Sequence, residues 1–141
     1  MTKSTFTAPP ADRRRVISLL VDNQSGVLAR VSGLFNRRGF NIDSLAVGVT
    51  EHPEISRMTI VVNGDEYIVE QVEKQLNKVI PVIKVRSLGP EAVSGELLLV
   101  KVACEAQSLG RINEIAALMK AEVADVSKAT VTLQYAGEHE K

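Results

Sequence analysis

The sequence DNQSGVL, residues 22–28, decides how the first half of this chain is organised. An apolar run at residues 16–21 precedes it and is typical of a buried strand. After it, apolar residues recur at the spacing of one helical face: Val27, Leu28, Val31, Leu34 and Phe35. The stretch is therefore predicted to form a turn between a strand and a helix.

The start of this helix is a candidate anion site. The first N–H groups of a helix have no partner within it, and the helix dipole makes that end positive. Asn23 or Ser25 is expected to cap the helix with a side-chain oxygen, and Gly26 lets a ligand or a second backbone come close. Two interpretations stay open: an ordinary capped helix, or a binding site for a carboxylate or phosphate.

Composition favours a globular protein without a strong electrostatic preference. The chain has 141 residues, 45% of them hydrophobic, enough for one domain or two small ones. Lysine plus arginine and aspartate plus glutamate both number 17, so net charge favours neither nucleic acid nor a membrane surface. The single cysteine, Cys104, allows no disulfide within the chain, and no signal peptide or membrane-spanning run is recognised. We therefore expect a cytoplasmic location and no nucleic-acid or membrane partner.

The order of predicted elements indicates a ferredoxin-like domain, an α+β fold, over residues 13–88. Residues 1–12 contain two prolines and no apolar period and are expected to form a flexible tail. Gly39 is expected to end the first helix in a left-handed conformation, and residues 63–65 to start the second. The predicted elements are strands 16–21, 41–49, 56–62 and 82–88 and helices 27–38 and 66–78. Two such βα units give a four-stranded antiparallel sheet with both helices on one face.

The pattern restarts after residues 89–95, which are predicted to be a linker. Strands are expected at 97–103, 121–126 and 130–135, and a helix at 110–120. Four residues of this helix are predicted to face inward: Ile112, Ile115, Ala116 and Met119. The second unit, residues 96–141, lacks the last helix and strand of the first. We expect it to be a partial C-terminal domain, truncated relative to a longer chain.

No catalytic or metal-binding constellation is recognised in the sequence. Cys104 ends a predicted strand without a nearby histidine and is interpreted as a core residue. His52 and His139 have no metal-ligand spacing to another His or Cys, and GxGxxG, Walker and HExxH patterns do not occur. An RNA-recognition module needs aromatic residues on its strands, and the first four have none. An acyl-phosphate hydrolase of this fold would need an arginine in the loop after the first strand, and that loop has none. A small-molecule sensor is therefore favoured.

Three segments carry a resemblance to a known family: SLLVDNQSGVLARVSGLFNRRGFNIDSLAVG (18–48), ISRMTIVV (55–62) and VEQVEKQLNKVIPVIKV (69–85). They closely resemble the regulatory small subunit of acetolactate synthase, or acetohydroxyacid synthase. The similarity begins near Arg14 and continues through ELLLVKV, VADVS and TLQYAG, so only the N-terminal tail lies outside it. The resemblance implies an ACT domain followed by a second ferredoxin-like domain.

The same resemblance implies a regulatory role in branched-chain amino acid biosynthesis. The chain would be a non-catalytic subunit that activates a separate catalytic (large) subunit and confers feedback inhibition by valine, or by leucine or isoleucine. No cofactor or metal is expected in this chain; thiamine diphosphate, Mg and FAD are expected only in the catalytic subunit. Two rival interpretations remain: an ACT-type amino-acid sensor that regulates a different enzyme, and a small acyl-phosphate hydrolase of the same fold.

In the resembled family, effector sites lie where two ACT domains pair, so a homodimer is expected. The effector carboxylate would meet N–H groups and an amide of the first turn, and Asn41 would accept from the effector ammonium. The expected effector-binding residues are Asn23, Gln24, Ser25, Gly26, Val27, Leu28, Asn41 and Ile42. Strand 41–49 is an edge strand in the predicted topology, and two such edges would join into an eight-stranded sheet. Small residues on its face shared with Ile42 would permit close approach at the dimer interface: Ser44, Ala46 and Gly48.

Overall fold

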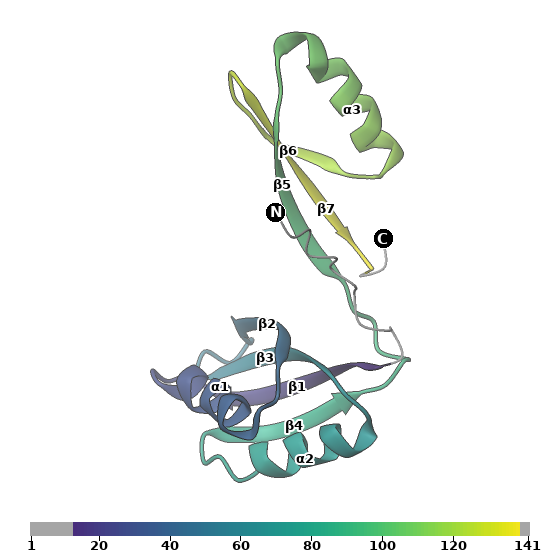
Figure 1. Cartoon of the computed structure of the whole chain (residues 1–141). Helices are drawn as coiled ribbons and strands as arrows, with labels where there is room; N and C mark the ends of the chain where they lie inside the picture. The colour runs from purple at the N-terminus through teal and green to yellow at the C-terminus, as the bar shows by residue number, and fades with distance from the viewer. Residues whose placement is uncertain (1–12, 139–141) are drawn as a thin grey trace, which may run out of the picture. The chain divides into compact units, whose positions relative to one another are not determined.

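The computed structural model describes residues 13–138 and divides the chain into two units, residues 1–92 and 93–141 (Figure 1). The division falls inside the segment expected to be a linker. The predicted N-terminal tail and His139 lie outside the described residues.

The first unit has the predicted βαββαβ order. Its elements are β1 (Arg14–Asp22), α1 (Val27–Arg38), β2 (Ile42–Val49), β3 (Ile55–Asn63), α2 (Glu66–Leu76) and β4 (Val82–Leu88). The strands form one sheet in the order β2-β3-β1-β4, and all three pairings are antiparallel. Figure 1 shows α1 and α2 on the same side of this sheet. The predicted ferredoxin-like fold is therefore confirmed, with β2 as an edge strand.

One apolar core between the sheet and its two helices holds this unit together. The strands contribute Ile17, Leu19, Val21, Met58, Ile60 and Val62, and the helices contribute Val27, Val31, Leu34, Phe35, Val72 and Leu76. All of these are under 10% exposed. Period-two alternation on β1 and the 3.6-residue period on α1 place these residues on facing surfaces, which is why the sequence pattern located the core correctly.

Local signals set the ends of both helices. Gly39 ends α1 with φ of 70°, the predicted left-handed conformation, and its N–H donates to carbonyl oxygens of Phe35 and Asn36. Asp65 precedes α2, and its side chain accepts a hydrogen bond from the N–H of Ile68. The α2 helix ends at Leu76, two residues before the predicted end at residue 78.

A register shift in β2 makes one prediction wrong. Ile42 lies opposite Val62, while Ser44 lies opposite Val61, so Asp43 is the extra residue of a bulge. Val62 faces the core, and Ile42 therefore joins Leu45 and the helix side of the sheet. Ile42 does not share a face with Ser44, as strict alternation had predicted, because a bulge inverts the alternation on its two sides.

The second unit is a three-stranded antiparallel sheet with one helix. Its elements are β5 (Glu96–Ala103), a 3₁₀ turn (Ala106–Ser108), α3 (Leu109–Leu118), β6 (Glu122–Val126) and β7 (Thr130–Gly137), with the strand order β5-β7-β6. Cys104 is 8% exposed, as expected for a core residue.

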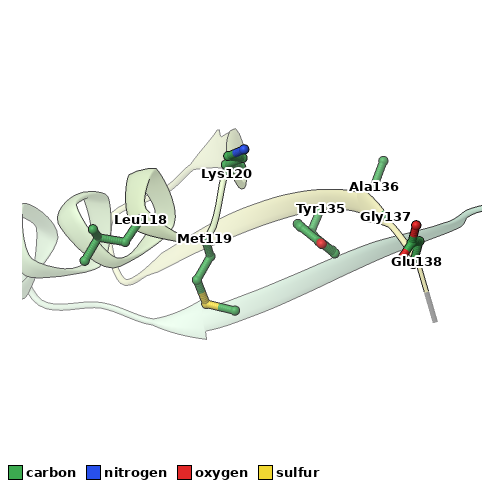
Figure 2. A pocket seen from close by; sticks show the side chains of 7 residues that line it. All are labelled: Leu118, Met119, Lys120, Tyr135, Ala136, Gly137 and Glu138. Carbon is green, nitrogen blue, oxygen red and sulfur yellow. The ribbon is translucent and has the colours of Figure 1, made fainter. Parts of the chain in front are cut away.

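The inward face predicted for α3 is only partly covered. Ala116 is buried and Ile112 is partly buried, but Ile115 and Met119 are 48% and 59% exposed, so the predicted inward face is not fully buried. The main contacts of the helix are with β6 and the 3₁₀ turn. An open hollow of about 500 Å³ lies beyond its end, lined by Leu118, Met119, Lys120, Tyr135, Ala136, Gly137 and Glu138 (Figure 2).

Candidate functional site

The turn between β1 and α1 is open to solvent. Residues 23–26 are exposed, Val27 is buried in the core, and Leu28 is 45% exposed. Within the turn, the Gln24 N–H donates to the carbonyl oxygen of Asp22. The turn therefore presents its backbone outward while Val27 fixes the start of α1 to the core.

Gly26 is the N-cap residue of α1, with φ of 85° and ψ of −11°. A side-chain cap by Asn23 or Ser25 was expected, and that prediction is wrong: no side chain caps the helix, and the Asn23 side chain donates to Pro53 instead. The chain enters the helix through a left-handed residue, a conformation that glycine adopts without strain. A Cβ atom added at Gly26 would have no heavy atom within 4 Å apart from its chain neighbours, so it would not clash with another element.

The N-terminus of α1 differs from that of α2 in charge and capping. The first turn of α1 contains no acidic residue, whereas α2 has the Asp65 cap and Glu66. The partial positive charge at the start of α1 is therefore not offset by a local carboxylate. The Val27 N–H donates to the Gln24 carbonyl oxygen at 3.5 Å. The next N–H groups, those of Leu28 and Ala29, are suited to binding an anion from outside the helix.

Asn23 connects this turn to the loop between β2 and β3. Its backbone N–H donates to the Glu54 carbonyl oxygen at 2.8 Å. Its side-chain Nδ2 donates to the Pro53 carbonyl oxygen at 2.9 Å. One N–H of the side-chain amide is thus engaged, and the amide oxygen and second N–H remain for another partner.

Asn41 and Ile42 lie at the opposite end of the sheet from the turn. Strands β1 and β2 run in the same direction, because each is antiparallel to β3, so Asn41 precedes the start of β2 while Asn23 follows the end of β1. The eight residues of β2 separate the two ends by about 25 Å. Asn41 donates from Nδ2 to the Asp43 Oδ1 at 2.9 Å. A single chain therefore does not bring Asn41 together with the turn.

The edge strand β2 has two chemically different faces. Ser44, Ala46 and Gly48 lie opposite Val61, Thr59 and Arg57 on the side away from the helices. Leu45, Val47 and Val49 lie on the helix side and are 39%, 48% and 60% exposed. This apolar strip, Leu45, Val47 and Val49, was not among the residues singled out from the sequence. The alternation of large apolar residues along an edge strand is the signal that would have indicated it.

Two kinds of feature are absent from the part of the chain that the structure describes. Residues 13–138 contain no group of three or more His, Cys, Asp or Glu side chains arranged to hold a metal ion. Over the same residues, no helix is long and apolar enough to cross a membrane.

Two family models match the chain, one for each unit. Residues 17–84 match the AHAS small subunit-like ACT domain, and residues 95–141 match the small subunit of acetolactate synthase. The first match runs from within β1 into β4, and so contains the whole turn and all of β2.

Curated relatives and a solved structure agree with these matches. The chain is 48% identical over 128 residues to the probable acetolactate synthase small subunit of Archaeoglobus fulgidus, covering 91% of this chain and 80% of the relative. It is 52% identical over 126 residues to the acetolactate synthase small subunit of Mycolicibacterium smegmatis, covering 89% and 74%. The crystal structure of the Thermotoga maritima small subunit superposes with a TM-score of 0.84 at 36% identity, covering 91% and 81%. The chain therefore belongs to the family of acetolactate synthase small subunits, with an ACT domain in its first unit.

Proposed function

We propose that this regulatory subunit binds valine, or leucine or isoleucine, at the turn that opens α1, and so controls a separate catalytic subunit. The observation that carries the proposal is the start of α1. It opens with Gly26 in a left-handed conformation, with neither a side-chain cap nor an acidic residue in its first turn. An α-amino acid brings the carboxylate that such a helix N-terminus favours.

The effector's other two groups need further partners. Its ammonium needs an acceptor, and the Asn41 amide oxygen remains available because the Asn41 nitrogen is the atom that bonds Asp43. Its branched side chain needs an apolar surface, which the exposed Leu28 offers beside the turn. Within one chain, Asn41 and the turn lie at opposite ends of the sheet, so the complete site requires a second copy.

A twofold dimer through β2 supplies the second copy. If two β2 edges pair antiparallel around a twofold axis, the start of one strand lies beside the end of the other. Asn41 of the second copy then lies near the turn of the first. The same pairing extends the sheet to eight strands and covers the apolar strip, Leu45, Val47 and Val49. Ser44, Ala46 and Gly48 would lie along the seam on the other face.

The chemistry belongs to the catalytic subunit in this proposal. The small subunit carries no cofactor, and thiamine diphosphate, Mg and FAD reside in its partner. Binding of the small subunit raises the activity of the catalytic subunit, and valine bound at the dimer interface lowers it again.

Calorimetry and reconstitution test the proposal together. Titrating the chain with valine, leucine and isoleucine should give saturable binding of at least one of them. Acetolactate formation should be absent for the chain alone, present for the catalytic subunit, and higher and amino-acid-sensitive for the mixture. Pyruvate condensation by the purified chain alone would refute the non-catalytic role, and hydrolysis of an acyl phosphate would favour the rival enzyme.

A further inference from the structure

The turn proposed to hold the effector is anchored on both flanks by carbonyl oxygens of neighbouring loops. On one flank, the Asp22 N–H donates to the Pro81 carbonyl oxygen at 2.9 Å, just before β4. On the other, the Asn23 N–H donates to the Glu54 carbonyl oxygen at 2.8 Å, just before β3. Because β1 lies between β3 and β4 in the sheet, these two bonds hold the start of the turn from both sides.

A third bond fixes the side chain of Asn23. Its Nδ2 donates to the Pro53 carbonyl oxygen at 2.9 Å, so one N–H of the amide is engaged and the plane of the amide is held. The amide oxygen and the second N–H, which remain for the effector, then keep fixed positions. A polar side chain that is ordered before its ligand arrives loses less conformational entropy when the ligand binds.

Pro53 restricts the loop that supplies the acceptors on the β3 side. It is the second residue of the β-turn 52–55, which the Ile55 N–H closes on the His52 carbonyl oxygen at 2.9 Å. Proline at this position has its φ fixed at about −65° before the turn forms. The turn is therefore restricted by its own sequence, and it presents its two central carbonyl oxygens to Asn23.

We propose that Pro53 is a positioning residue of the effector site: the turn that it restricts holds the Asn23 amide in place before the effector binds. The inference rests on the proposed function and adds to it a residue that does not touch the effector. Since Pro53 acts only through Asn23, its replacement leaves every proposed effector contact in the chain but removes the preset orientation of one of them. Ordering one such side chain in advance should strengthen binding by about three- to tenfold.

Pro53→Gly tests the inference in the full chain, because glycine keeps the carbonyl oxygen but frees the backbone of the turn. Calorimetric titration with valine, leucine and isoleucine should show about three- to tenfold weaker binding of the amino acid that the wild-type chain binds best. Pro53→Ala, which restricts the backbone more than glycine and less than proline, should give an intermediate affinity. Asp65→Ala is the control for stability: it removes the side-chain cap of α2 and should leave the affinity within about twofold of wild type.

A second measurement needs neither the effector nor a variant. In the free wild-type chain, ¹⁵N relaxation of the Asn23 side-chain amide should give an order parameter of about 0.85, typical of a rigid backbone. Asn36 is the comparison, an exposed asparagine whose side chain makes no hydrogen bond among the described residues, and it should give less than about 0.6. In Pro53→Gly, the Asn23 value should fall toward that of Asn36.

The outcomes distinguish the positioning role from the proposed function. Wild-type affinity in a folded Pro53→Gly would refute the positioning role alone, and so would an Asn23 amide as mobile as that of Asn36 in the wild-type chain. An equal loss of affinity in Asp65→Ala would trace the effect to stability and refute it as well. If Pro53→Gly does not fold, Pro53→Ala and the wild-type order parameter decide. If the wild-type chain binds none of the three amino acids, the proposed function is refuted, and the inference with it.

Discussion

Gly26→Asp is expected to abolish most valine binding while leaving the fold intact. Gly26 has φ of 85°, and a Cβ atom added there would have no heavy atom within 4 Å apart from its chain neighbours. A non-glycine residue in the left-handed region costs about 1–2 kcal/mol, and Asp and Asn tolerate that region better than most residues. The first unit buries an extensive core, so we expect this strain to lower the melting temperature without unfolding the domain.

The loss of affinity comes from the added charge. The carboxylate introduced by Gly26→Asp would lie beside the N–H groups that are proposed to hold the effector carboxylate, and would compete for them. Two like charges about 4 Å apart repel by about 4 kcal/mol at an effective dielectric constant near 20, which corresponds to about a thousandfold in affinity. The turn is exposed and solvent screens part of this repulsion, so we expect a ten- to hundredfold loss.

Two control variants separate charge, size and strain. Gly26→Asn has nearly the shape of the Asp variant without its charge and should bind valine at least fivefold more tightly than Gly26→Asp. Gly26→Ala adds only a methyl group and reports the backbone strain. Calorimetric titration with valine, together with a thermal melt of each variant, gives the comparison. If Gly26→Asp folds normally and binds valine with wild-type affinity, the effector does not bind at the start of α1.

Three further predictions test the interface, the caps and the core. Val47→Asp puts a charge on the apolar strip and should weaken the dimer at least tenfold by light scattering or analytical ultracentrifugation. Ile83→Asp, on β4 at the other edge of the sheet, should leave the dimer unchanged. Equal weakening of the dimer by both variants would argue against β2 as the interface. Asp65→Ala removes the side-chain cap of α2 and should lower the free energy of unfolding, measured by denaturant titration, by about 1 kcal/mol. Ser25→Ala should lower it by less than about 0.5 kcal/mol, because Ser25 caps no helix. Leu19→Ala, at a fully buried position, should cost about 2–5 kcal/mol, and the half-exposed Ile83→Ala much less; similar losses would contradict the assigned core.

The sequence alone determined the order of elements and the fold of the first unit. These follow from short-range patterns: period two for β1, period 3.6 for α1 and α2, glycine after Arg38, and Asp65 before α2. Each is a property of a few neighbouring residues, so it is readable without knowing what lies across the sheet. The same patterns located the turn at residues 22–28 as the candidate site.

Other features were decided only by the tertiary structure, because they depend on register and on distant neighbours. The bulge at Asp43, which moves Ile42 to the helix side, exists only in the pairing with β3. Asn23 could not be recognised as a bridge rather than a cap, because its partner Pro53 is 30 residues away. The exposure of Ile115 depends on which elements pack against α3, and these are β6 and the 3₁₀ turn. The separation of Asn41 from Asn23 likewise follows from the strand pairing. Because β1 and β2 run in the same direction, these two predicted effector-binding residues lie at opposite ends of the sheet.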